Sequence, residues 1–250
     1  METEYIEKPT IPDNSSRKSA PKVVIYADGS CLKNGMPDAQ SGAGAVLINE
    51  ESSRIKLKAC YLGALTNQQA EIMACIFALE DLKMPARVEI FSDSKYVIDT
   101  MMGINRMKTN RPFWSRLVTA CLRHHITWNW IRGHSGDVFQ ETADRLSRAA
   151  ATAKTSLDKA TLDRLARLLQ GKPDEETVRM IHDALKAIAA VCDGARKLDH
   201  KGFNKLDSAT GHDFARKRHL DRKEAIAGLG LLGTYRGQVA LIDGRLVLLL

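Results

Sequence analysis

The sequence has few cysteines, and no two of them are close together. Five cysteines occur in 250 residues, and there is no CxxC pair. An odd number of widely spaced cysteines is not typical of a zinc site or of a disulfide framework. We therefore expect reduced, mostly buried thiols, as in a protein of a reducing compartment.

The sequence also lacks the long apolar runs of membrane proteins. No run approaches the roughly 20 apolar residues that a helix needs to cross a bilayer. The first ten residues, METEYIEKPT, are acidic and contain no apolar stretch, so they do not resemble a signal peptide. These absences predict a cytoplasmic protein that does not associate with membranes.

Acidic residues are the minority among the charged ones. Lys and Arg number 37 against 30 Asp and Glu, which gives a net charge of +7. Residues 1–150 contain 19 basic and 17 acidic side chains, whereas residues 151–250 contain 18 and 13. A basic excess concentrated in one part of the chain favours a polyanionic partner.

The chain divides by pattern into a tail and two domains. Residues 1–21 are polar and are predicted to be a disordered tail. Three strand-like segments follow, typical of an antiparallel meander, and then helical and strand-like segments alternate. This order predicts an α/β domain over residues 22–153.

Residues 154–250 are predicted to form a mostly α-helical, basic C-terminal extension. Two segments with helical periodicity each end at a glycine. Asp221 and Glu224 form a variant of the capping box at the start of a further helix, in which three glycines weaken the expectation of an unbroken helix. The last residues are predicted to form a hairpin around Asp243 and Gly244.

Four carboxylates occupy positions that one site could use. Asp28 and Asp93 each end a predicted strand, while Glu71 and Asp144 lie in predicted helices. Strand ends at one edge of a sheet converge, and nearby helix termini point at that edge. Four such groups would raise one another's pKa unless a cation neutralises them, and hard oxygen ligands suit Mg²⁺ or Mn²⁺. Two ions about 4 Å apart could activate a water and stabilise the leaving oxygen of a phosphodiester.

Each carboxylate also has an ordinary alternative role. Asp28 and Asp93 could cap a turn or a helix, since Asp-Gly is common turn chemistry. Glu71 and Asp144 could be solvated helix residues. The metal site is favoured because all four acids fall where one site would use them.

Five motifs together resemble the signature of type-1 ribonuclease H in order and spacing. They are YADGS with Asp28, TNQQAEI with Glu71, FSDSKYV with Asp93, GHSGD with His134 and ETADRLS with Asp144. The resemblance covers about residues 22–153 and implies a five-stranded mixed sheet flanked by helices. It also implies metal-dependent endonucleolytic cleavage of the RNA strand of an RNA–DNA hybrid, with 3′-hydroxyl and 5′-phosphate ends.

The resemblance implies roles for individual residues. The four acids would hold two Mg²⁺ ions, which Mn²⁺ could replace, and Asp28 would lie between both. His134 would assist proton transfer or product departure, for which an unperturbed pKa of about 6.5 is suitable. Amide side chains can read the 2′-hydroxyl of RNA. The expected contacts with the hybrid are Gly29, Ser30, Cys31, Asn34, Thr66, Asn67, Gln68 and Gln140.

Two features depart from the family pattern. The segment after Asp93 is too short for the Lys- and Trp-rich protrusion that many members carry, and Gln140 stands where Asn is usual. Basic and aromatic side chains remain, and Trp114 could stack on a nucleic acid or be buried against the sheet. The candidate nucleic-acid contacts are Lys95, Lys108, Arg111, Trp114, Arg216, Lys217 and Arg218.

The C-terminal extension has two open interpretations. From Arg196 to Lys223 there are nine Lys or Arg against four Asp. The segments GFNKLD, GHDFA and TYRGQ faintly resemble a module appended to some helicase-like nucleic-acid proteins. The extension could bind phosphates in a salt-sensitive way, or it could be a solvated helical domain.

Two other functions remain open beside hybrid cleavage. The first is a hybrid- or duplex-binding protein with a vestigial nuclease centre, against which the four intact carboxylates argue. The second is a related metal nuclease of the same superfold that acts on DNA. The TNQQAE and GHSGD segments favour the hybrid instead.

Overall fold

The computed structural model describes residues 20–133, 135–192 and 201–247. His134 and nearly all of the predicted tail, residues 1–21, lie outside the described residues. The chain divides into two compact units between Leu162 and Asp163.

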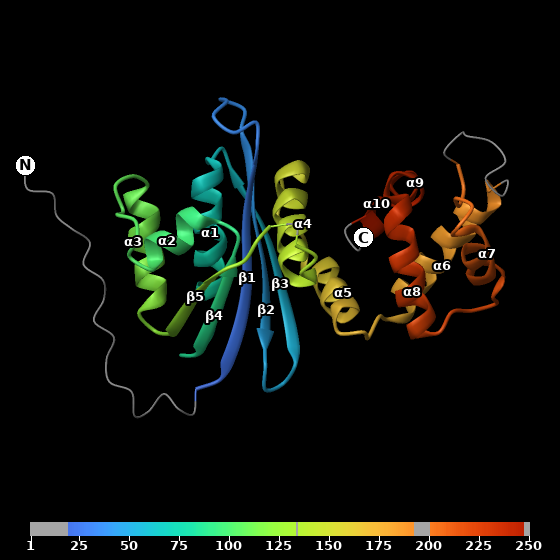
Figure 1. The fold of residues 1–250 in the computed structure, drawn as a ribbon, viewed down its shortest axis with the longest axis horizontal. Helices are drawn as coiled ribbons and strands as arrows, with labels where there is room; N and C mark the ends of the chain where they lie inside the picture. The colour runs from blue at the N-terminus through green and yellow to red at the C-terminus, as the bar shows by residue number, and fades with distance from the viewer. Residues whose placement is uncertain (1–19, 134, 193–200, 248–250) are drawn as a thin grey trace, which may run out of the picture. The chain divides into compact units, whose positions relative to one another are not determined.

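The first unit is built on a five-stranded mixed sheet (Figure 1). Its strands are β1 (Lys22–Leu32), β2 (Gln40–Asn49), β3 (Arg54–Gly63), β4 (Arg87–Ser92) and β5 (His125–Trp130). The strand order is β3-β2-β1-β4-β5, in which β1, β2 and β3 are antiparallel and β1, β4 and β5 are parallel. The predicted meander and mixed sheet are therefore confirmed.

Helices cover both faces of this sheet (Figure 1). One face carries α1 (Asn67–Glu80), α2 (Lys95–Met101) and α3 (Arg111–Cys121), and the other carries α4 (Val138–Ala153). Because α1 lies between the sheet and α3, most of its residues are buried. Helices on both faces of a mixed sheet give the α/β architecture that the sequence predicts.

Two glycines let helices approach the central strands at backbone distance. A Cβ at Gly29 would lie 2.2 Å from the carbonyl carbon of Ala70 in α1, and a Cβ at Gly44 would lie 2.1 Å from the carbonyl oxygen of Ala143 in α4. A side chain at either position would push the helix away. Gly44 is the cross-strand partner of Asp28, so the close approach of α4 occurs beside this acid.

The first unit extends past the predicted boundary. Two hydrogen bonds attach the segment after α4 to β3: Tyr61 N donates to Ser156 Oγ (3.0 Å), and Leu157 N donates to the Ala59 carbonyl (3.1 Å). Because this segment is bound to the sheet, the division between the units falls after Leu162 rather than at the end of α4.

The second unit is helical, as predicted. Its elements are α5 (Lys159–Leu169), which spans the division, α6 (Glu175–Ala190), α7 (Ser208–Arg216), α8 (Arg222–Leu232), the 3-10 turn η1 (Gly233–Tyr235), α9 (Arg236–Ile242) and α10 (Gly244–Val247). The capping box of Asp221 and Glu224 is present at the start of α8.

The predicted hairpin around Asp243 and Gly244 is wrong, because these residues connect α9 to α10. Asp243 N donates to the Val239 carbonyl (2.9 Å), and Leu246 N donates to the Asp243 carbonyl (3.0 Å). Val239 and Leu246 are fully buried. Burial of these two side chains in a helical arrangement overrides the turn preference of Asp-Gly.

The helices α8, η1 and α9 form one stretch, Arg222–Ile242, with a mean hydropathy of 1.2. By length and composition alone it could cross a membrane, and it is the one such helix among the described residues. The sequence analysis found no apolar run of this length, because the stretch joins shorter apolar segments. Gly228 packs against Leu185 and Ile181 of α6, so one side of the stretch belongs to the core of the second unit.

The GFNKLD segment is also part of this core. Phe203 is buried and packs edge-to-face on Tyr235, with 5.3 Å between ring centroids. A Cβ at Gly211 would lie 2.4 Å from the Phe203 ring. The Tyr235 hydroxyl donates to Asp207 (2.6 Å) and accepts from Asn204 N (3.0 Å). These contacts give GFNKLD, GHDFA and TYRGQ a structural role within the second unit.

Candidate active site

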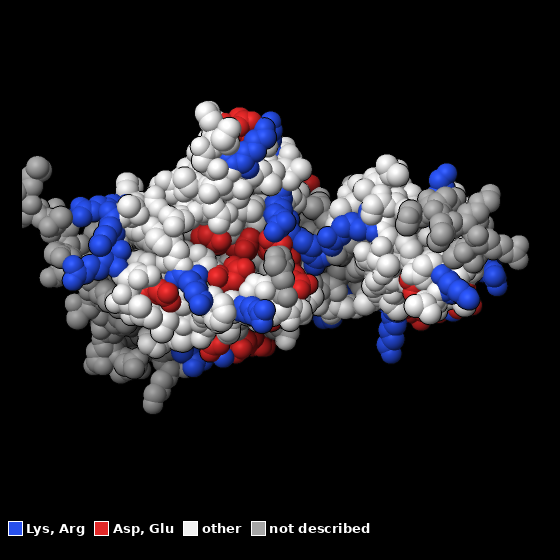
Figure 2. Space-filling view, turned by 45° about the horizontal axis from the view of Figure 1, so that its top comes forward, with Lys and Arg blue, Asp and Glu red and all other residues white. Residues whose placement is uncertain are grey.

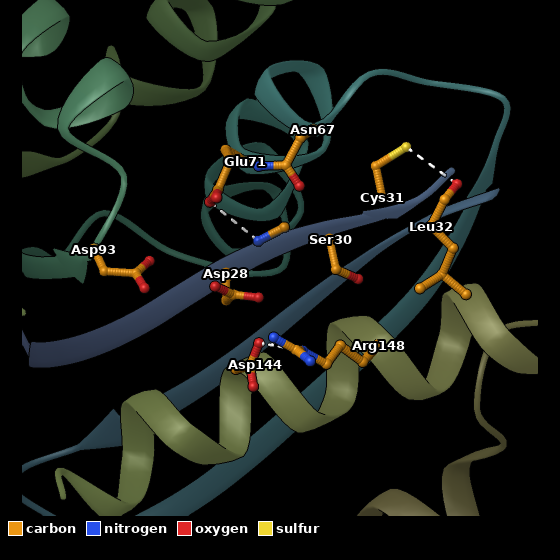
Figure 3. Close-up of a pocket in the computed structure, with 10 residues that line it drawn as sticks. Asp28, Ser30, Cys31, Leu32, Asn67, Glu71, Asp93, Asp144 and Arg148 are labelled. Carbon is orange, nitrogen blue, oxygen red and sulfur yellow. Dashed lines mark hydrogen bonds and ion pairs between the residues drawn. The ribbon is translucent and has the colours of Figure 1, made fainter. Parts of the chain in front are cut away.

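The four predicted acids meet in one pocket of the first unit (Figure 3). Asp28 belongs to β1, Glu71 to α1 and Asp144 to α4, and Asp93 directly follows β4. The pocket has a volume of about 340 Å³. One carboxylate oxygen from each of Asp28, Glu71 and Asp93 lies within 4.8 Å of the other two. Three oxygens at this spacing can bind one cation.

Burial and mutual repulsion make this group of acids unusual. Asp28 is 5% exposed and Glu71 is 9% exposed. Burial raises the pKa of Asp28 to about 7, helped by the charges of Asp93 and Asp144 and opposed by a hydrogen bond from Ser147. Burial and then the charges of Asp28 and Asp93 raise the pKa of Glu71 well above its usual range. A bound cation would offset this repulsion.

The pocket fits a hard divalent ion by its chemistry. Its closest ligand atoms are all carboxylate oxygens, which Mg²⁺ and Mn²⁺ prefer. The oxygens come from a strand, a helix and the residue after a second strand, so the packed core of the unit sets their spacing. A divalent cation bound here would be held by parts of the chain that cannot move independently.

Neighbouring donors hold each of the three clustered acids. Gly29 N donates to Glu71 Oε2 (3.1 Å). The Ser147 hydroxyl donates to Asp28 Oδ2 (2.6 Å). The third acid, Asp93, has a longer contact of 3.4 Å from an amide nitrogen in α4. Glu71 is thus oriented by an ordinary hydrogen bond and Asp28 by a short one.

Asp144 lines the pocket but is not part of the closest group. Its Oδ1 accepts a hydrogen bond from Arg148 Nε (2.7 Å), one turn further along α4 (Figure 3). Arg148 lines the same pocket. The structure therefore brings all four predicted acids together, with three near one another and the fourth paired to a guanidinium.

Figure 2 shows acidic side chains gathered on this part of the first unit, with separate Lys and Arg side chains on the surface around them. Such an arrangement combines a cation-binding pocket with positive groups nearby. Acidic side chains repel a polyanion, and Lys and Arg side chains around the pocket would offset this repulsion.

Seven of the eight predicted substrate contacts line the pocket or lie near the start of α1, the helix that contains Glu71. Asn34 Oδ1 accepts a hydrogen bond from Asn67 N (3.0 Å), and Thr66 is the N-cap of α1. Asn34, Thr66 and Gln68 are exposed near the start of α1. Four of the predicted contacts line the pocket itself: Gly29, Ser30, Cys31 and Asn67.

Gln140 lies in a different environment from the expected one. It is 2% exposed, and its Nε2 lies 3.4 Å from Asp93 Oδ1. Its Oε1 has no hydrogen-bond partner in the described part of the chain. In this structure the Gln140 side chain is thus buried beside Asp93, and its contact with a substrate stays a prediction.

The expected nucleic-acid contact of Trp114 is wrong, because this residue is fully buried. Its ring packs against Tyr96 at a centroid distance of 5.3 Å, within the core between the sheet and the helices. The apolar face of α3 packs on α1, which takes the indole away from solvent. The alternative of burial is confirmed.

The remaining basic candidates of the first unit are exposed: Lys95, Lys108 and Arg111. Lys95 Nζ lies 4.8 Å from the ring centroid of Trp130. Trp130 is 47% exposed and donates from Nε1 to the Asp93 carbonyl (3.1 Å). Trp130 is a further candidate contact that the sequence analysis did not name. Its position at the end of β5, paired with the last residue of β4, places it next to Asp93 and could have suggested it.

The basic candidates of the second unit are less uniform. Arg216 and Arg218 are exposed. Lys217 forms an ion pair with Glu224 (2.8 Å), so its charge is partly neutralised within the unit. His134 lies outside the described residues, and its role stays a prediction.

Known proteins similar to this chain match its first unit, and they are ribonucleases H. The RNase H family profile matches residues 20–152. The ribonuclease H of Phenylobacterium zucineum is 41% identical over 144 residues, covering 51% of this chain and 89% of that protein. The ribonuclease H of Pseudoalteromonas translucida is 38% identical over 152 residues, covering 54% and 94%. The solved structure of LC9-RNase H1, a type 1 RNase H, has a TM-score of 0.48 and 28% identity, covering 55% and 75%.

Proposed function

The chain belongs to the ribonuclease H family, and we propose that it hydrolyses the RNA strand of RNA–DNA hybrids in a reaction that depends on divalent metal ions. Family membership makes it a nuclease and a hydrolase. The observation that carries the proposal is the cluster of Asp28, Glu71 and Asp93, whose oxygens lie within 4.8 Å in a pocket open to solvent.

The acids have separate roles in this proposal. Asp28, Glu71 and Asp93 would hold one Mg²⁺, and Asp28 with Asp144 would hold a second, with Mn²⁺ as a substitute. When bound, the two ions supply an activated water and stabilise the leaving oxygen of the phosphodiester, which gives 3′-hydroxyl and 5′-phosphate ends. The chain's own contribution is to keep these carboxylates fixed, with Asp28 and Glu71 buried and Asp93 and Asp144 half-buried, so that their negative charge acts at short range.

The residues beside the pocket would bind the hybrid. The amide of Asn67 can donate and accept hydrogen bonds, which suits recognition of a 2′-hydroxyl. The backbone of Gly29 and Cys31 can approach the sugar-phosphate chain closely, because it lies at the pocket wall. Lys95 over Trp130 offers a positive charge and a flat ring next to Asp93.

A cytoplasmic location is part of the same proposal. All five cysteines are free thiols. A reducing compartment keeps such thiols reduced.

The deciding experiment is incubation of the full chain with an end-labelled RNA–DNA hybrid and Mg²⁺. We expect RNA fragments with 3′-hydroxyl ends, an intact DNA strand and no cleavage in EDTA. Asp93→Asn removes one ligand charge and should abolish turnover while hybrid binding remains. The matched variant Asp81→Asn, which changes an acid paired with Lys58 away from the pocket, should retain turnover.

Two results would replace this proposal by its rivals. Hybrid binding without cleavage under either Mg²⁺ or Mn²⁺ would indicate a binding protein with a vestigial centre. Cleavage of an all-DNA duplex in preference to the hybrid would indicate a DNA nuclease of the same superfold.

A further inference from the structure

Ser147 is a buried residue of α4 whose hydroxyl lies beside the central acid of the pocket. It is fully buried, with Oγ 2.6 Å from Asp28 Oδ2 and 2.9 Å from the carbonyl oxygen of Asp144. The hydroxyl has one proton to donate, and a carboxylate is a stronger acceptor than a carbonyl. The nearer and stronger acceptor is Asp28.

A helical serine or threonine commonly donates to a carbonyl of its own helix, and α4 contains an example. Thr142 Oγ1 donates to the Val138 carbonyl (2.7 Å) and is also buried. Thr142 has no contact with a carboxylate among its hydrogen bonds in the described chain. Ser147 differs because its hydroxyl reaches across to β1.

The fold is built so that this contact can form. A Cβ at Gly44 would lie 2.6 Å from Ser147 N, and a Cβ at Gly42 would lie 2.1 Å from Ser147 O. Gly44 pairs with Asp28 across β1 and β2, and Gly42 pairs with Ser30. Two positions without side chains therefore let the backbone of Ser147 rest on the sheet next to Asp28.

We propose that Ser147 is a positioning residue for the metal centre: its hydroxyl holds the Asp28 carboxylate in the orientation that faces Glu71 and Asp93. A carboxylate oxygen has two lone pairs, so the bond to Oδ2 leaves one lone pair on that oxygen and both on Oδ1 for a cation. The inference rests on the proposed metal-dependent function. It adds a residue outside the four acids that determines how well they bind the ion.

The test compares wild type with Ser147→Ala in the full chain. Alanine is smaller than serine and favours a helix, so the variant should fold. In calorimetric titration with Mg²⁺ and no hybrid, we expect binding about tenfold weaker than in wild type. In hybrid cleavage, kcat at fixed Mg²⁺ should fall while KM for the hybrid stays unchanged. Ser147→Cys, with a weaker donor, should lie between the two.

Thr142→Val is the matched control, since it removes a buried hydroxyl from the same helix without touching an acid. It should bind Mg²⁺ as wild type does. Three results would overturn the inference: Mg²⁺ affinity and kcat unchanged in Ser147→Ala, an equal loss in Thr142→Val, or a loss of hybrid binding by Ser147→Ala in EDTA, which would indicate general damage.

The same titration separates this inference from the proposed function. If wild type itself neither binds Mg²⁺ nor cleaves the hybrid, both are wrong. If wild type does both and Ser147→Ala matches it, the positioning role alone is wrong.

Discussion

Replacing Asp28 with Asn should stabilise the metal-free protein while removing its activity. The folded protein disfavours the ionised form of Asp28, because burial and the charges of Asp93 and Asp144 raise its pKa to about 7 despite the hydrogen bond from Ser147. Asparagine has nearly the same size and carries no charge. Its side-chain carbonyl can still accept the Ser147 hydrogen bond.

The raised pKa sets the sign and the size of the effect. The folded state holds the Asp28 proton more tightly than the unfolded state. The free energy of unfolding of wild type therefore falls as pH rises from about 4 to about 7. Above pH 7 the whole cost of ionising Asp28 in the folded state is present. A change from 3.8 to about 7 corresponds to about 4 kcal/mol, at about 1.4 kcal/mol for each tenfold change in the protonation equilibrium. Because solvent in the pocket screens the charges, we expect Asp28→Asn to gain about 2–3 kcal/mol at pH 8.

Urea unfolding followed by tryptophan fluorescence in EDTA measures this gain. All three tryptophans, Trp114, Trp128 and Trp130, belong to the first unit, so the signal reports on the unit that contains the pocket. The gain should shrink at pH 5, where Asp28 of wild type is mostly protonated. Mg²⁺ at ten times its dissociation constant should add about 1.4 kcal/mol to wild type and much less to the variant.

Asp81→Asn provides the opposite case for the same chemical change. Burial raises the pKa of Asp81, but hydrogen bonds from Lys56 and Lys58 outweigh it and lower the pKa overall. Removing this charge should therefore destabilise the first unit. A loss of stability in Asp28→Asn at pH 8, or a gain that is the same at pH 5 and pH 8, would refute the reasoning.

Three further predictions concern packing, capping and binding. Gly44→Ala should lower the free energy of unfolding by about 3 kcal/mol in urea, since its Cβ would lie 2.1 Å from the Ala143 carbonyl oxygen; full stability would contradict the close approach of α4. Asp174 is the N-cap of α6 and accepts a hydrogen bond from Thr177 N (2.8 Å), so Asp174→Ala should weaken amide-exchange protection of α6 by about 1 kcal/mol. Unchanged protection would argue against this capping role. Lys95→Gln should make the fall of log affinity for the hybrid with log salt concentration less steep, by about one in slope. A slope equal to that of wild type would exclude a phosphate contact of Lys95.

The place of the acids could be predicted because it depends on the chain direction. β1 and β4 are parallel neighbours, so Asp28 and Asp93 come to the same edge of the sheet. The pairing of Asp144 with Arg148 could not be predicted in the same way. It depends on which of two side-chain conformations of Asp144 is lower in free energy. In one the carboxylate pairs with Arg148, one turn away, and in the other it faces the other acids.

The expectations that were wrong share a physical cause. The Asp243-Gly244 hairpin was inferred from the turn preference of Asp-Gly, and the nucleic-acid contact of Trp114 was one of two alternatives drawn from its place in the segment after Asp93. Burial overrides both. Leu246 and Trp114 are fully buried. Burying a large apolar side chain contributes about 1.5–3 kcal/mol, which exceeds the preference of a short segment for one turn type. The sequence shows the turn preference of a short segment, but it does not show which part of the fold an apolar side chain packs against.

The pocket is held together by the core around it rather than by its own charges. Its acids repel one another, so in the metal-free protein they would separate if they stood on loops. Asp28, Glu71 and Asp144 stand instead on elements fixed by backbone packing, where Gly29 admits α1 and Gly44 admits α4, and Asp93 directly follows a strand of the same sheet. The Ser147 hydroxyl then acts on a carboxylate whose position the sheet already determines. It follows that a cation arriving at this site would meet ligands already in place, and that the cost of gathering them is part of the folding free energy of the first unit.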